Sequence, residues 1–279
     1  MLNFSRPPAV EVHGHRGCRG LYPENTLPAF LHAARLGVDV QELDIVLSAD
    51  GQVVVSHEPW MSAAICLDAR GQRIPVAEEQ QHNLYQLPYA TIRRYDCGQL
   101  QHPDFPEQQS VPAYKPLLRE VVAATDALTR ELGRSPVRFS VEVKSTPPGD
   151  LLFHPEPAVF VPVVLAELQK LGIVPRTTLL SFDRRILQEA RRQLPDLGLC
   201  LLVEDETPFE QHIRALGFVP EVYGPHYGLV SAQLLKAAAR HHLRVVPWTV
   251  NDPTELRRLA QLSVAGLTTD YPDRLLAML

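Results

Sequence analysis

The sequence predicts one closed (β/α)8 barrel, a TIM barrel, as a single domain over residues 1–279. Predicted strands alternate with helical patterns, and in one place with an insertion followed by a helix. Eight such units in a chain of this length are typical of the barrel. A doubly wound open sheet is the alternative fold, but no G-x-G-x-x-G motif opens a helix here. The strands are expected to end near His15, Asp44, Lys144, Phe182, Glu204, Gly224, Val250 and Asp270.

The first unit is a strand end, a loop over residues 13–26 and a helix. Asn25 or Thr26 can cap the helix, Pro28 suits its first turn, and Gly37 ends it. The helix has an apolar stripe at helical spacing, made of Leu27, Phe30, Leu31, Ala34 and Val38.

The second strand is predicted to fold back as a hairpin. Residues 38–47 form a buried strand, and residues 53–57 return after a short link that contains an Asp-Gly turn signal. Since so short a link cannot make a parallel crossover, the two strands must be antiparallel. If the turn centres between Asp50 and Gly51, His57 lies directly opposite Asp44.

Residues 60–116 interrupt this rhythm. The segment holds six prolines and six aromatic residues, with short helical pieces between them. We expect it to be an insertion within the barrel domain that packs over one end as a fairly rigid cap.

The four cysteines are widely spaced and include no C-x-x-C pair, which excludes a thiolate zinc site of the usual spacing. We expect four free thiols. A bridge between Cys18 and Cys66 is the one disulfide that the positions favour, because both flank the predicted active face.

After the insertion a regular strand–helix rhythm continues to the C-terminus. Asp183 and Ser231 are placed to cap helices, and Pro253 suits a first helical position. One late strand is expected over 244–250. The expected helices cover residues 117–132, 157–171, the segment after 183, 208–216, 231–241, 252–262 and a short stretch after 272.

The composition limits the partners and the compartment. The formal net charge is −5 and the pI is near 6.1, which argues against a nucleic-acid partner. No apolar run is long enough to form a transmembrane segment. The N-terminal residues 1–12 lack the apolar region of a signal peptide, so we expect a cytoplasmic protein as the sequence stands. A removed leader would instead imply a periplasmic or extracellular location.

Three carboxylates are predicted to meet at the carboxyl ends of the strands, where such barrels carry their active sites. Glu42, Asp44 and Glu142 would repel one another strongly there without a cation. Oxygen ligands suit one Mg²⁺ or Ca²⁺ ion rather than Zn²⁺. The alternative is that Glu42 pairs with Lys144 and Asp44 with Arg16 as structural ion pairs.

His15 and His57 flank this cluster and form a candidate acid–base pair, because proton transfer to and from oxygen needs groups that titrate near the working pH. Arg16 is a planar cation suited to a phosphate. With one lysine it can form a local anion site despite the negative net charge.

With these residues in view, the chain closely resembles the glycerophosphodiester phosphodiesterase family of the phospholipase C-like phosphodiesterases. The match covers nearly the whole chain in the family's order, and one departure is Glu58, where many members have Asp. The matching motifs are His15-Arg16-Gly17, Pro23-Glu24-Asn25-Thr26, Glu42-x-Asp44, Asp50-Gly51, His57, Glu142-x-Lys144, Trp248-Thr249-x-Asn251 and Thr268-Thr269-Asp270-Tyr271-Pro272.

The resemblance implies a role for each of nine residues. The metal ligands would be Glu42, Asp44 and Glu142, and the general acid and base would be His15 and His57. The phosphate would be held by Arg16 and Lys144, and the alcohol pocket would be walled by Phe182 and Trp248.

The expected function is metal-dependent hydrolysis of small-molecule glycerophosphodiesters to an alcohol and glycerol 3-phosphate. One alternative is a related barrel phosphodiesterase that acts on intact phospholipids, of the phospholipase C or D type. Another is a catalytically inactive binding protein. The sequence leaves open the alcohol, the oligomeric state, and whether water or the substrate's own hydroxyl attacks the phosphorus.

Overall fold

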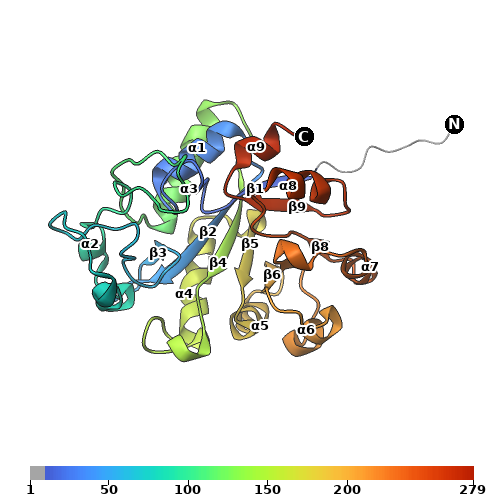
Figure 1. Ribbon diagram of the computed structural model, residues 1–279. Helices are drawn as coiled ribbons and strands as arrows, with labels where there is room; N and C mark the ends of the chain where they lie inside the picture. Colours follow the sequence, from blue (N-terminus) through green and yellow to red (C-terminus); the bar gives the residue numbers. More distant parts are fainter. Residues whose placement is uncertain (1–9) are drawn as a thin grey trace.

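The computed structural model describes residues 10–279 and shows a nearly closed barrel of parallel strands (Figure 1). The first nine residues, which hold most of the segment examined for a signal peptide, lie outside this range. The strands pair in the order β8-β7-β6-β5-β4-β2-β1-β9, and β3 pairs with β2. The predicted (β/α)8 fold is confirmed. The strands are β1 (Glu11–Gly14), β2 (Val40–Leu47), β3 (Val53–Val55), β4 (Arg138–Val143), β5 (Thr177–Ser181), β6 (Gly198–Val203), β7 (Val222–Pro225), β8 (Arg244–Val245) and β9 (Gly266–Thr269).

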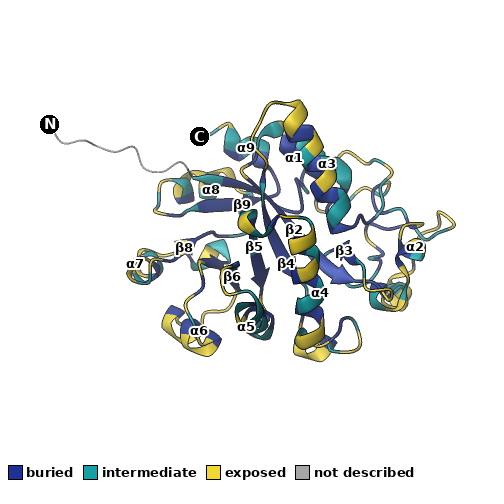
Figure 2. Cartoon of the chain, turned by 180° about the vertical axis from the view of Figure 1, so that it is seen from behind, coloured by how far each residue is buried: buried dark blue, intermediate teal, exposed yellow. Residues whose placement is uncertain are grey.

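The helices surround the strands and turn their exposed faces outward (Figure 2). Several begin and end at the residues that the sequence indicated. Gly37 closes the first helix with φ +93°, and the Asp183 carboxylate accepts the N–H of Arg185 at a helix start. The helices of the barrel are α1 (Leu27–Leu36), α3 (Leu118–Glu131), α4 (Pro157–Lys170), α5 (Arg184–Gln193), α6 (Phe209–Leu216), α7 (Ala232–Arg240), α8 (Pro253–Ala260) and α9 (Pro272–Leu276).

The barrel closes between β8 and β9 through individual backbone hydrogen bonds rather than a regular ladder. Ala265 donates its N–H to the Val245 carbonyl at 2.8 Å, and Thr268 donates to the Pro247 carbonyl at 3.0 Å. The strand predicted over 244–250 is regular over its first two residues alone. Pro247 has no N–H to donate, so it ends the regular pairing there.

The hairpin is antiparallel as predicted, but its register differs by one residue. The Ser56 N–H donates to the Asp44 carbonyl at 3.0 Å, so Ser56 rather than His57 lies opposite Asp44. The turn centres on Asp50, whose carboxylate accepts the N–H of Tyr89 at 2.9 Å. The predicted pairing was therefore wrong. The Ser48 N–H donates to the Gln52 carbonyl at 3.1 Å, so three residues join the strands instead of the two of the expected Asp-Gly turn.

The segment 60–116 contains short helical pieces, namely η1 (Val76–Gln81), η2 (Leu84–Gln86) and α2 (Tyr89–Ile92). Its apolar side chains form a small core of their own, including Met61, Leu84 and Ile92. This core packs against Val46 and Val54 of the hairpin. The segment is thus anchored on the outer face of β2 and β3.

The expectation of four free thiols is wrong, and so is the Cys18–Cys66 bridge that the positions favoured. Cys66 forms a disulfide with Cys97, and both residues belong to the 60–116 segment. Cys18 is buried instead, and its thiol donates to the carbonyl of Ala29 at 3.2 Å. Cysteine spacing alone does not reveal which thiols meet, because the fold of the intervening chain brings them together.

Within residues 10–279, every helix is too short or too polar to cross a lipid bilayer.

Reduction of the Cys66–Cys97 bridge should destabilise the protein. The bridge spans 31 residues, so its loss should lower the free energy of unfolding by about 3 kcal/mol. Urea denaturation of the wild type with and without dithiothreitol measures this difference. The variant with both Cys66→Ser and Cys97→Ser is the control and should not respond to the reductant. An equal midpoint for oxidised and reduced wild type would contradict the prediction.

Candidate active site

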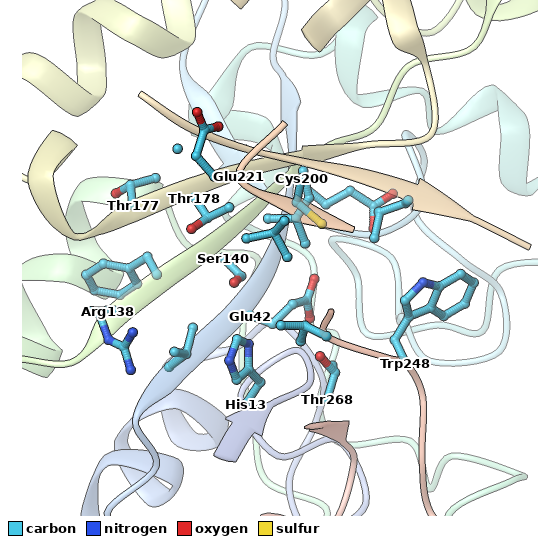
Figure 3. Close-up of a pocket in the computed structure, with 18 of the residues that line it drawn as sticks. His13, Glu42, Arg138, Ser140, Thr177, Thr178, Cys200, Glu221, Trp248 and Thr268 are labelled. Atoms are coloured by element: carbon cyan, nitrogen blue, oxygen red, sulfur yellow. The ribbon is translucent and has the colours of Figure 1, made fainter. Parts of the chain in front are cut away.

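The predicted site residues gather at the carboxyl ends of the strands, at one end of a cavity of about 370 Å³. The cavity continues along the barrel interior, with Arg138 and Thr177 toward its far end and Trp248 toward the mouth (Figure 3). Asp44 does not line the cavity itself, but it contacts two residues that do, Arg16 and Lys144. The predicted residues that line the cavity are His15, Arg16, Glu42, His57, Glu142, Lys144, Phe182 and Trp248.

Three buried carboxylates form the centre of the site. Glu42 and Asp44 share one face of β2, and Asp44 lies opposite Glu142 of β4 in the sheet register. One oxygen from each lies within 4.8 Å of the others. Burial, with repulsion from Asp44 and Glu142, raises the pKa of Glu42 well above its usual value. This buried set of oxygen donors fits a divalent metal ion such as Mg²⁺ or Ca²⁺.

Asp44 is held rigidly in its charged form. The Asn25 side-chain amide donates to Asp44 Oδ2 at 2.8 Å, and Arg16 Nε lies 3.3 Å from the same oxygen. Burial alone would raise the pKa of Asp44, but the charges of Arg16, His57 and Lys144 hold it far below its usual value.

Two residues of the loop after β1 have left-handed backbone conformations beside Glu42. Arg16 has φ +49° and Gly17 has φ +86°. The Arg16 backbone N–H then donates to Glu42 Oε2 at 2.8 Å, which fixes that carboxylate. A Cβ at Gly17 would lie 2.8 Å from Ala29 of α1, so a side chain is excluded here on both conformational and steric grounds.

His15 is oriented by Asp270 at the end of β9. The two side chains share a hydrogen bond of 2.7 Å between Nδ1 and Oδ1, which leaves His15 Nε2 facing Glu42 at 3.9 Å. Burial lowers the pKa of His15 to about 4 although Asp270 acts in the opposite direction. The neutral ring therefore donates from Nδ1 and presents an unprotonated Nε2.

His57 lies just beyond β3 and is oriented by its neighbour Glu58. Its Nδ1 lies 2.6 Å from Glu58 Oε1. Burial raises the pKa of Glu58, but the hydrogen bond to His57 and the charge of Lys115 outweigh this and bring it to about 2. The two histidines thus share one arrangement, in which an ionised carboxylate binds Nδ1 and the other ring nitrogen is free.

The two cations predicted to bind phosphate also have partners within the protein. Lys144 Nζ lies 2.7 Å from Glu142 Oε1 and 3.6 Å from Asp44 Oδ1. Arg16 forms a 2.8 Å ion pair with Glu24 in addition to its contact with Asp44. Of the two contacts named in the alternative of structural pairs, the one between Arg16 and Asp44 is present, whereas Lys144 contacts Glu142 and Asp44.

Two further carboxylates organise the site, although their sequence motifs did not indicate a role for them. Glu24 is buried and pairs with Arg16, and Asp270 binds both His15 and Arg19, the latter at 2.8 Å. The strand-end position of Asp270 was a signal for its importance. For Glu24, which lies in a loop far from any strand end, the family motif was the single signal.

An aromatic pair borders the mouth. The rings of Phe182 and Trp248 meet edge to face with centroids 5.3 Å apart. The Trp248 indole N–H donates to the Gly224 carbonyl at 2.7 Å, which fixes the ring. Phe182 is 37% exposed and remains accessible to a ligand.

Comparison with known proteins agrees with this geometry. The model of the glycerophosphoryl diester phosphodiesterase family matches residues 15–274. A glycerophosphodiester phosphodiesterase of Bacillus altitudinis is 26% identical over 95% of this chain and 96% of its own length. A solved structure from Silicibacter pomeroyi, provisionally assigned as a glycerophosphoryl diester phosphodiesterase, is 32% identical with a TM-score of 0.85 and covers 98% of this chain and 95% of that one.

A phosphodiesterase from Oleispira antarctica, solved in complex with sn-glycerol-3-phosphate, shares the fold with a TM-score of 0.74 at 19% identity, covering 96% and 95% of the two chains. The family match spans almost every described residue, including the loop after β1, the carboxylate cluster and both histidines. This chain therefore belongs to the glycerophosphoryl diester phosphodiesterase family.

Proposed function

We propose that the protein hydrolyses glycerophosphodiesters to an alcohol and glycerol 3-phosphate, by acid–base catalysis at a divalent metal site. The observation that supports this most directly is the matched pair of histidines, each bound at Nδ1 by a carboxylate and placed beside the carboxylate cluster. The Oleispira antarctica phosphodiesterase holds sn-glycerol-3-phosphate as product, which supports the same product class here.

The charges around the mouth support a divalent cation. The three central carboxylates share two cationic neighbours, Arg16 and Lys144, so ionisation of all three leaves negative charge that a divalent ion would offset. Glu42, Asp44 and Glu142 would hold the ion, and when bound it would neutralise the diester and lower the barrier to attack.

We assign the base to His15 and the acid to His57. Asp270 accepts the Nδ1–H of His15, so His15 Nε2 is free to take a proton from the attacking oxygen. Glu58 holds His57 at the other side of the cluster, where the ring can protonate the departing alkoxide. Either water or the neighbouring glycerol hydroxyl can be the attacking group, and the second route passes through a cyclic phosphate.

Arg16 and Lys144 are proposed to hold the phosphate oxygens. Both line the cavity, and the charge that grows on these oxygens during attack is stabilised by fixed cations. Their internal partners keep them in place before substrate arrives, so little reorganisation accompanies the reaction. Phe182 and Trp248 would form the wall of the pocket that contacts the alcohol group of the substrate.

The insertion 60–116 is proposed to cover part of the mouth. Its Phe105 ring packs under the Arg19 guanidinium at 4.6 Å, and the Gln108 side-chain amide donates to the Arg19 carbonyl at 2.7 Å. His102 Nε2 lies 3.9 Å from Glu24 Oε2. These contacts bring the insertion onto the loop after β1, beside His15 and Arg16.

Removal of divalent metal should abolish turnover of glycerophosphocholine, because the buried carboxylates would repel the anionic substrate. Activity after exhaustive EDTA treatment, and after addition of Mg²⁺ or Ca²⁺, measures this. Glu142→Gln should weaken metal binding, so a higher metal concentration should be needed for the half-maximal rate. Undiminished activity in EDTA, or an unchanged metal requirement in Glu142→Gln, would contradict the metal site.

Replacement of either His15 or His57 by Ala should lower kcat on the order of 10²–10⁴-fold. The double variant should lose little more than the worse single variant, because the two groups act in one reaction. Metal binding, measured by calorimetry, should stay near normal. A His57→Ala enzyme with near-wild-type kcat on a diester of a poor leaving group would refute the assignment.

Asp270→Asn should lower kcat on the order of 10²–10⁴-fold, because an amide can stabilise the wrong tautomer of His15. The Asp270 charge raises the pKa of His15, so its loss should also move the acidic limb of the rate profile to lower pH. Rates measured across pH at two saturating metal concentrations test both effects. A variant with normal kcat and an unmoved acidic limb would show that Asp270 is structural.

A further inference from the structure

A buried lysine that the sequence motifs do not include lies close to the histidine that we assign as the acid. Lys115 is the second-to-last residue of the insertion 60–116 and is 4% exposed. It does not line the active-site cavity, so it does not touch a substrate bound there. Burial of an ammonium group is costly unless its surroundings stabilise the charge. The position of Lys115 therefore requires a reason other than direct contact with phosphate.

The backbone places Lys115 in a row of side chains that leads to the carboxylate cluster. Val54 of β3 forms an antiparallel bridge with Leu117, and the same register sets Lys115 opposite Ser56. Ser56 is in turn opposite Asp44 of β2, because its N–H donates to the Asp44 carbonyl. Facing residues on neighbouring strands project from the same side of a sheet. The side chain of Lys115 thus lies on the side that carries the site.

Two hydrogen bonds connect Lys115 to the turn that carries His57. The Lys115 ammonium donates to Ser56 Oγ at 2.8 Å, and the Ser56 hydroxyl donates to the Glu58 carbonyl at 2.6 Å. Ser56 is fully buried, so water does not compete for its hydroxyl. His57 lies between the two residues that this chain of hydrogen bonds holds. The backbone is therefore fixed on both sides of the histidine.

The charges around Lys115 match this position. Burial lowers the pKa of Lys115 below its usual value, although the carboxylates of Glu58, Glu24 and Asp44 act in the opposite direction. Together with the hydrogen bond to His57, the charge of Lys115 holds the pKa of Glu58 down against the effect of burial. An ionised Glu58 is the form that accepts a proton-bearing Nδ1 of His57, at 2.6 Å.

We propose that Lys115 is a positioning residue for the acid: its ammonium, through Ser56, fixes the turn so that Glu58 can hold the His57 ring toward the leaving alcohol. This inference rests on the proposed function, because it concerns the residue assigned there as the acid. Since Lys115 acts through His57, its replacement should slow the protonation of the leaving group and spare the other parts of the reaction.

The first test uses two diesters of glycerol 3-phosphate that differ in the leaving group. Choline leaves as a poor alkoxide that needs a proton, whereas p-nitrophenolate leaves without one. Lys115→Met should lower kcat for glycerophosphocholine at least about tenfold and change kcat for the p-nitrophenyl diester less than about twofold. KM should stay near the wild-type value for both diesters. Equal losses of kcat with the two diesters would indicate a general structural defect and would overturn the proposal.

A double variant shows whether the effect passes through His57. The acid is absent in His57→Ala, so Lys115→Met added to this variant should cost less than about twofold more in kcat for glycerophosphocholine. A further loss as large as that in the wild-type background would contradict the positioning role.

Tyr89→Phe is the matched control for the local packing. The Tyr89 hydroxyl donates to the backbone carbonyl of Lys115 at 3.3 Å and to Glu120 at 2.8 Å, and it makes no contact with the ammonium. This variant should keep the wild-type kcat with both diesters. A loss equal to that in Lys115→Met would mean that the backbone at this position, and not the ammonium, is responsible, and the proposal would fail.

NMR of His57 separates this proposal from the proposed function, because it needs no turnover. In protein labelled with ¹⁵N-histidine, at about pH 9 where a histidine ring is ordinarily neutral, two-bond correlations show which ring nitrogen carries the proton. The His57 signals are identified by their loss in His57→Ala. The wild type should hold the proton on Nδ1, beside Glu58, and Lys115→Met should move part of it to Nε2. An unchanged tautomer would overturn the proposal. A shift seen in a protein whose wild type lacks diesterase activity would refute the proposed function alone.

Discussion

The crowding of three buried carboxylates at the ends of β2 and β4 is the constraint on which the rest of the site depends. Two of them share a face of one strand, and the sheet register brings the third beside Asp44. Their mutual repulsion is costly in a desolvated position. The protein offsets it by turning the Arg16 backbone toward Glu42 and by placing Asn25, Arg16 and Lys144 around Asp44. What these groups leave uncompensated matches a divalent ion.

Closure of the barrel also serves the chemistry. The first and last strands pair in parallel, with Gly14 opposite Thr269, so the residues that follow each of them are neighbours. The His15 N–H donates to the Thr269 carbonyl at 2.9 Å, and Asp270 then reaches the His15 ring. His15 and Asp270, 255 residues apart in the chain, are held together where the first and last strands pair.

The insertion contacts both the fold and the site. It has its own apolar core and a disulfide, and it packs against the hairpin that carries His57. One part of it contacts the loop after β1, and another, through Asn83 and Trp60, contacts the loop between β4 and α4.

The sequence by itself determined the barrel, the order of its units and the residues at the strand ends, because alternating apolar patterns and capping residues are local signals. It therefore placed His15, Glu42, Asp44 and Glu142 in one mouth. Tertiary contacts decided the rest. The disulfide depends on how residues 60–116 fold, the hydrogen bond from Tyr89 to Asp50 on the packing of that segment against the hairpin, and the contact between Trp60 and Phe153 on two loops that meet only in the folded chain. No local pattern encodes such contacts, since each partner lies far away in sequence.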